Sequence, residues 1–302
     1  MTAAPGVLLT GPPPGPGYLL GGRCRIELDR PRLMGVLNVT PDSFSDGGRF
    51  IKVDAALARA RQMVREGADL IDVGGESTRP GAPAVTAAQE LDRVLPVIEA
   101  LQRELPIPLS IDTTKSAVAT AAVAAGAMFV NDVSGLTFDP VMAATVAASG
   151  AGLFVMHTRG RPETMQADTR YADLVGEVRE GLRCSVAAAV AAGVAPERIA
   201  IDPGIGFGKD TAGNLELLRR LGEFAELGRP ILLGTSRKSF IGRVLDQPDP
   251  ARREAGTLAT VALGVAAGAR LFRVHEVRPA REAAFMAWAV CRGERWAPEE
   301  AS

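Results

Sequence analysis

The sequence has 302 residues, of which 47% are hydrophobic, and this is enough apolar material for one large core. Its 34 basic and 35 acidic residues leave a formal charge of -1, which excludes the broad basic surface by which proteins bind nucleic acid or anionic membranes. The three cysteines, Cys24, Cys184 and Cys291, lack paired spacing, which excludes a disulfide framework or a zinc site and favours a reducing cytoplasm.

The N-terminal segment, residues 1–17, is rich in proline and glycine, a composition that predicts a flexible tail. It has no basic stretch before an apolar run, and no later segment is long and apolar enough to span a bilayer, so we expect a cytoplasmic protein with no membrane partner. Two short apolar runs then flank Gly21-Gly22, which predicts an N-terminal β-hairpin over residues 18–30.

Beyond the hairpin, short runs rich in leucine and β-branched residues alternate with alanine-rich helical stretches. These runs begin at Leu33, Asp69, Pro108, Met128, Gly152, Arg198, Pro230 and Arg270. Near-continuous apolar strands separated by helices indicate a parallel sheet buried on both faces, and a count of eight favours a closed barrel. The predicted fold is therefore an α/β TIM (β/α)8 barrel over residues 31–292, followed by a C-terminal tail at 293–302.

Glycines precede several of these strands, where each is expected to take the left-handed conformation that ends a helix. They are Gly67, Gly126, Gly150, Gly193 and Gly268. The first helix is expected from Val53, with Leu57, Ala60 and Val64 facing the sheet. A regular alternation of strand, helix and glycine is what a barrel built from repeated units requires.

Uncommon polar residues gather at the ends of the predicted strands. The only histidines, His157 and His275, end the fifth and eighth strands, while Asn38 and Asn131 end the first and fourth. In a barrel these positions share one rim, where the strand-to-helix loops converge and barrel enzymes place their active sites. Polar residues also end strands because chains turn there, but turning accounts poorly for both histidines.

Three rim positions have the chemistry to hold a flat heterocycle. Asp112, Asn131 and Asp202 end the third, fourth and sixth strands, where carboxylates can accept two N–H bonds from a guanidine-like ring and an amide can supply a donor and an acceptor. Taken singly, each could equally bond a loop backbone. Arg273 and His275 lie two apart on the last strand, so they share a face and can clamp one anion.

Two loops carry less decisive patterns. The segment from Asn38 to Phe50 has the length of a lid, although a solvated turn that caps a helix is about as plausible from its composition. In the second loop, DVGGESTRPG, Arg79 offers a forked donor for phosphate or carboxylate and Pro80 stiffens the turn.

Two later loops contribute groups that suit an aromatic ligand. In DPGIGFGKD, Phe207 can lay its ring against a flat ligand, and in GTSRKS, Ser236 and Lys238 can reach the same pocket. The segment HTRGRPETMQ, from His157, carries no prediction.

The chain contains, in this order, NVTPDSFSDGG, DVGGESTRPGA, ID-T-x-K, NDVSG, DPGxGFGK, GxSRK and R-x-H. Together these motifs, from about Leu33 to Val277, resemble the dihydropteroate synthase family. The resemblance implies a barrel transferase of folate biosynthesis that joins 6-hydroxymethyl-7,8-dihydropterin diphosphate to p-aminobenzoate, giving 7,8-dihydropteroate and diphosphate. It also implies Mg²⁺ on the leaving group, competition by sulfonamides, and a homodimer.

The resemblance further implies a role for each matching position. The pterin would lie on Asp112, Asn131, Met156, Asp202, Phe207, Gly234 and Lys238. The diphosphate would meet Asn38, Thr78, Arg79, Arg273 and His275, with Asn38 also near the metal. The p-aminobenzoate would meet Thr78, Pro80, Phe207, Ser236 and Lys238. The catalytic residues would be Lys238, Arg273, His275 and Arg79.

Two alternatives remain open at this stage. A pterin-dependent methyltransferase would need a corrinoid partner domain or a methyl donor, which nothing in the sequence encodes. A non-catalytic pterin-binding paralogue would keep the barrel without turnover, and the intact Arg79, Lys238, Arg273 and His275 argue against it. Glu276 follows His275 where the family more often has aspartate, but no assigned group is lost.

Overall fold

The computed structural model describes residues 15–40, 49–79 and 81–293, with residues 49–52 described by their backbone alone. Most of the two predicted tails, the centre of the predicted lid loop and Pro80 lie outside the described residues. The expectations for those segments therefore stay predictions.

Eight parallel strands among the described residues close into a barrel. They are β3 (Arg32–Asn38), β4 (Leu70–Gly74), β5 (Leu109–Asp112), β6 (Phe129–Asp132), β7 (Gly152–Met156), β8 (Ile199–Asp202), β9 (Leu232–Leu233) and β10 (Leu271–Val274). They pair in the order β8-β7-β6-β5-β4-β3-β10-β9, and a parallel bridge between Ile201 and Ile231 joins the two ends. The predicted barrel is confirmed, and every strand begins within two residues of its predicted start.

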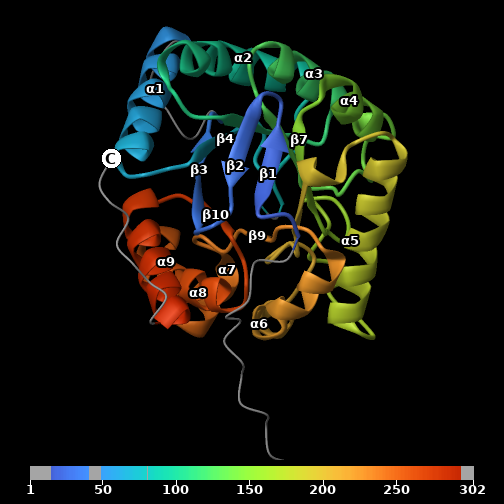
Figure 1. The fold of residues 1–302 in the computed structure, drawn as a ribbon, viewed down its shortest axis with the longest axis vertical. Helices are drawn as coiled ribbons and strands as arrows, with labels where there is room; N and C mark the ends of the chain where they lie inside the picture. Colours follow the sequence, from blue (N-terminus) through green and yellow to red (C-terminus); the bar gives the residue numbers. More distant parts are fainter. Residues whose placement is uncertain (1–14, 41–48, 80, 294–302) are drawn as a thin grey trace, which may run out of the picture.

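Helices surround the barrel (Figure 1). They are α1 (Arg49–Arg65), α2 (Ala87–Glu104), α3 (Ser116–Ala124), α4 (Met142–Ser149), α5 (Leu174–Ala191), α6 (Thr211–Arg219), α7 (Ser239–Val244), α8 (Glu254–Ala266) and α9 (Val277–Arg292). Three short 3-10 helices, η2 (Pro196–Arg198), η3 (Leu221–Leu227) and η4 (Pro250–Arg252), complete the described elements. In the described part of the chain, none of the helices combines the length and apolar character needed to cross a membrane.

The start of α1 differs from the prediction, because the helix begins at Arg49 rather than Val53. In the sequence it follows the glycine pair at 47–48, and glycine disfavours helix more than any other residue except proline. The predicted inward face holds, with Leu57 and Ala60 buried and Val64 packed against the core.

The predicted helix-ending glycines are also confirmed. Gly67, Gly126, Gly150, Gly193 and Gly268 have φ angles of 94°, 120°, 66°, 100° and 100°. Residues with a Cβ rarely adopt this left-handed region, which is why glycine stands at these turns.

An antiparallel hairpin, β1 (Tyr18–Gly21) and β2 (Cys24–Glu27), closes the amino-terminal end of the barrel. Figure 1 shows it lying across the middle of the ring of helices. Leu19, Ile26 and Leu28 are buried against a cluster that includes Met34 and Phe129 from the barrel strands. Because the hairpin fills this end, a ligand site must lie at the carboxyl ends of the strands.

The contribution of this closure can be measured with one substitution. Leu19 is fully buried under the hairpin, so Leu19→Ala is expected to lower the free energy of unfolding by about 2–5 kcal/mol through lost burial and the cavity left behind. Denaturant unfolding followed by circular dichroism is the measurement. Leu215, 44% exposed on α6, is the matched control, and Leu215→Ala should change stability by less than about 0.5 kcal/mol. Equal effects of the two substitutions would contradict the packing of the hairpin against the barrel.

Candidate active site

A cavity of about 480 Å³ lies at the carboxyl ends of the strands, opposite the hairpin. Residues that end or follow β3, β4, β6, β7, β8, β9 and β10 line it, as the barrel prediction requires. The predicted site residues in its lining are Asn38, Thr78, Arg79, Asn131, Met156, Asp202, Phe207, Gly234, Ser236, Lys238, Arg273 and His275. The topology therefore brings together side chains that are more than 200 positions apart in the sequence.

Asp112 is missing from the described lining, because its carboxylate lies buried behind the guanidinium of Arg273, which donates to Asp112 Oδ2 over 2.7 Å. Pro80 lies outside the described residues.

His157, which follows β7 at the rim, supports a neighbouring loop. Its Nδ1 lies 3.0 Å from the buried Nζ of Lys209, which also donates to the carbonyl oxygens of Gly204 and Phe207. Burial lowers the pKa of Lys209 to about 7. His157 and Lys209 thus hold the glycine-rich loop that carries Phe207, and neither belongs to the described lining of the cavity.

Arg273 is the centre of a buried polar network that spans four strands. Its Nε donates to Asp72 Oδ2 over 2.6 Å, and the amide of Asn131 donates to the same oxygen over 3.0 Å. Burial alone would lower the pKa of Arg273, but the charges of Asp72 and Asp112 outweigh it and raise that pKa. The network fixes the direction of Arg273 and Asn131 before any ligand binds.

The carboxylates of this site are held in unusual environments. Burial raises the pKa of Asp112, although the charge of Arg273 opposes the shift. Burial also raises the pKa of Asp202 to about 6, against the hydrogen bond of 2.7 Å that Gly204 N donates to Asp202 Oδ1. Asp112 Oδ1 is buried without a hydrogen-bond partner among the described residues, and such an acceptor is costly unless a ligand N–H satisfies it.

Lys238 lines the same cavity. Its Nζ is 3.9 Å from the centre of the Phe207 ring, and burial lowers the pKa of Lys238 to about 8. The preceding residue, Arg237, has a φ of 60°, which is strained for a residue with a Cβ. Two hydrogen bonds hold it there, from Arg237 N to Thr257 Oγ1 and from Arg253 Nη1 to Arg237 O.

His275 is bound to Ser236 by two contacts, one through its backbone and one through its ring. His275 N donates to Ser236 Oγ over 3.2 Å, and the same oxygen lies 2.9 Å from His275 Nδ1. Burial and the neighbouring Arg273 lower the pKa of His275 to about 3, so the ring is neutral at neutral pH. In the tautomer with its proton on Nε2, Nδ1 accepts the O–H of Ser236 and the Nε2–H group is available to an anion.

Several residues of the site escaped the sequence prediction. Asp72 lies inside an apolar strand, and a lone carboxylate in such a run could have been read as a buried, paired charge. Met165 is buried with Val133, Met156 and Phe207 at the cavity wall, although its segment carried no prediction. No local pattern marks Met165, because only the tertiary fold brings its loop over the barrel.

A family model described as pterin binding enzyme matches residues 34–275. The chain is 52% identical over 248 residues to a dihydropteroate synthase of Synechocystis sp., covering 82% of this chain and 86% of that relative. This chain belongs to the dihydropteroate synthases.

Solved structures of other dihydropteroate synthases have the same fold. The synthase of Xanthomonas albilineans with 4-aminobenzoic acid is 46% identical, has a TM-score of 0.85, and is matched over 91% of this chain and 98% of its own. The synthase of Yersinia pestis, in a sulfonamide drug complex, is 42% identical with a TM-score of 0.85, over 90% of this chain and 98% of its own. The barrel fold is therefore shared over nearly the whole length of each of these chains.

The raised pKa of Asp202 predicts a pH dependence of pterin binding. An ionised carboxylate accepts N–H groups of the ligand with both oxygens, whereas a protonated one carries an O–H donor that opposes them. The affinity for a pterin should therefore be lost as pH falls through about 6. Calorimetry with a pterin should give a Kd that is weaker by about tenfold at pH 5 than at pH 7, after correction for titration of the ligand. Asp202→Asn should reduce that change. A Kd that is constant over this range would contradict the assignment.

Proposed function

We propose that this dihydropteroate synthase performs its condensation in the cavity at the strand ends, with the pterin and the diphosphate in adjoining parts of it. The observation that carries the proposal is the convergence of anion-binding groups (Arg79, Arg273, His275) and N–H-accepting groups (Asp202, Asn131) on one cavity. We assign catalysis to the barrel, residues 31–292, whose amino-terminal end is closed by the hairpin, residues 18–30.

The pterin would be held by its polar edge and its faces. Asp112 Oδ1 and the carboxylate of Asp202 would accept N–H groups of the ring, while Asn131, fixed by Asp72, would supply an amide. Met156 and Phe207 belong to one small apolar cluster at the wall and would flank the ring. The amine of Lys238 and the backbone at Gly234 would complete this side.

The diphosphate would meet the cationic side of the cavity. Arg273 has five N–H donors, so its two bonds to carboxylates leave others for phosphate oxygens. His275 would add its Nε2–H, and Thr78 and Arg79 would approach from the loop after β4. These contacts neutralise charge that grows on the diphosphate as it departs.

Magnesium would bind beside Asn38. Mg²⁺ takes oxygen ligands and usually combines one or two protein groups with substrate phosphates and water, so the amide oxygen of Asn38 at the cavity fits this role. When bound, the ion lowers the barrier by stabilising negative charge on the leaving group.

The p-aminobenzoate would bind next to the methylene group of the pterin. Thr78, Pro80, Phe207, Ser236 and Lys238 would surround it. As the C–O bond to diphosphate breaks, the electron-rich pterin would stabilise a developing cation at its methylene carbon. The neutral aniline nitrogen, already a nucleophile, would attack that carbon and then release one proton to water. Since sulfonamides resemble this substrate, they would compete for the same surface.

A direct assay tests the function. Purified protein with both substrates and Mg²⁺ should release diphosphate and form dihydropteroate, as a control synthase does. Lys238→Ala and Arg273→Ala should each lower kcat/KM by about tenfold or more, about 1.4 kcal/mol of transition-state stabilisation, because each removes a charge at the reacting centre. Tight pterin binding without product would instead indicate a non-catalytic paralogue, and unchanged turnover in either variant would remove that residue's role.

We also propose a cytoplasmic homodimer. Cys24, Cys184 and Cys291, all within the described residues, are free thiols, which favours a reducing compartment. The neighbouring helices α8 and α9 expose large apolar side chains, with Leu263, Met286 and Val290 62%, 65% and 58% accessible. Sedimentation equilibrium should give twice the chain mass, and Met286→Glu should shift the protein toward monomer. A monomeric wild type would contradict the dimer.

A further inference from the structure

The loop between β4 and α2, described except for residue 80, carries Thr78 and Arg79 into the cavity. Its two ends are brought together by Glu76, whose Oε1 accepts a hydrogen bond of 3.0 Å from Val85 N. At the far end, Thr86 caps α2 through a reciprocal contact with Gln89. Glu76 therefore holds the two ends of the loop together.

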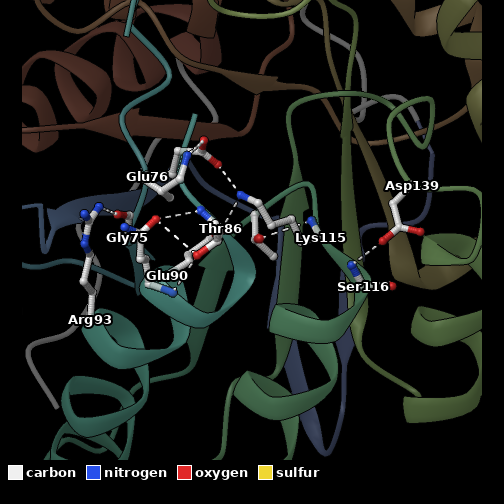
Figure 2. A network of polar contacts seen from close by, with 11 residues as sticks. Gly75, Glu76, Thr86, Glu90, Arg93, Lys115, Ser116 and Asp139 are labelled. Carbon is white, nitrogen blue, oxygen red and sulfur yellow. Dashed lines mark hydrogen bonds and ion pairs between the residues drawn. The ribbon is translucent and has the colours of Figure 1, made fainter. Parts of the chain in front are cut away.

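Glu76 is itself held from outside the loop (Figure 2). Lys115, which follows β5, places its Nζ 2.5 Å from Glu76 Oε2 and 2.7 Å from Glu90 Oε2. Glu90 belongs to α2 and its side chain is fully buried, whereas those of Glu76 and Lys115 are 20% and 25% exposed. Lys115 thus ties the loop base to α2 and to the β5–α3 connection.

Two further contacts pack α2 closely against the start of this loop. Arg93 donates to Gly75 O over 2.7 Å, as Figure 2 also shows. A Cβ at Gly75 would lie 2.7 Å from a side-chain carbon of Val94, so α2 packs directly on the backbone of the loop. Burial alone would lower the pKa of Lys115, but its hydrogen bonds to Glu76 and Glu90 outweigh burial and raise that pKa. Lys115 therefore stays cationic.

We propose that Lys115 is a positioning residue for the reaction, which acts through Glu76 to hold Thr78 and Arg79 over the diphosphate and the p-aminobenzoate. This inference rests on the proposed function of the cavity. Lys115 is absent from the described lining, whereas Glu76 belongs to it, so the effect of Lys115 is transmitted by the loop. The pterin contacts proposed above come from other strands and should be insensitive to it.

The experiment separates positioning from stability in the full-length enzyme. Lys115→Met leaves the buried charge of Glu90 uncompensated and should lower Tm, whereas Lys115→Met with Glu90→Gln removes that charge and should recover most of the Tm. Both variants should still lose about tenfold or more in kcat/KM for p-aminobenzoate, with pterin Kd changed by less than about twofold. Lys115→Arg keeps the cation and should recover activity to within about threefold of wild type.

Hydrogen exchange provides a readout that does not depend on turnover. Amides between residues 77 and 86 should exchange faster in both Lys115→Met proteins than in wild type. Arg179→Met is the matched control, because it breaks an ion pair with Glu226 that lies away from the cavity, and it should change neither exchange in this loop nor kcat/KM.

The outcomes are distinguishable. Wild-type activity in the double variant, or loop exchange equal to wild type, would overturn the positioning role and leave Lys115 as a stabilising charge alone. A wild-type protein that binds pterin but makes no dihydropteroate would refute the proposed function. The exchange experiment would still report whether Lys115 holds the loop.

Discussion

The guanidinium of Arg273, enclosed by the carboxylates of Asp72 and Asp112, constrains the rest of the site. A buried cation requires partners, and these two come from β4 and β5 while Arg273 comes from β10. Removing one partner of such a group typically costs about 3–5 kcal/mol. The barrel supplies the partners because its strands end at one rim, which the hairpin leaves free by filling the opposite end.

This arrangement prepares two kinds of binding in one cavity. In the proposed binding mode, the carboxylates accept N–H groups of a heterocycle, and the cations that balance them keep donors for a phosphate group. His275, neutral at neutral pH, is held at the same rim by its contact with Ser236. Because these groups are oriented before the substrates arrive, little reorganisation is needed when charge moves to the leaving diphosphate.

The sequence predicted most of the frame, because apolar strands and helix-ending glycines leave local patterns. It also placed Asn131, Asp202 and His275 at the rim by their positions at strand ends. It could not distinguish His157, which supports a loop, from His275, because both end strands and only the packing around Lys209 separates them. Likewise, the link from Lys115 to Glu76 joins two loops whose proximity is a property of the closed barrel.

A crystal structure with a pterin and diphosphate would test the central claim most directly. The account predicts the pterin edge against Asp112, Asn131 and Asp202, with the diphosphate within hydrogen-bond distance of Arg273 and His275. A pterin bound elsewhere, or a diphosphate that leaves Arg273 in contact with the carboxylates alone, would contradict it.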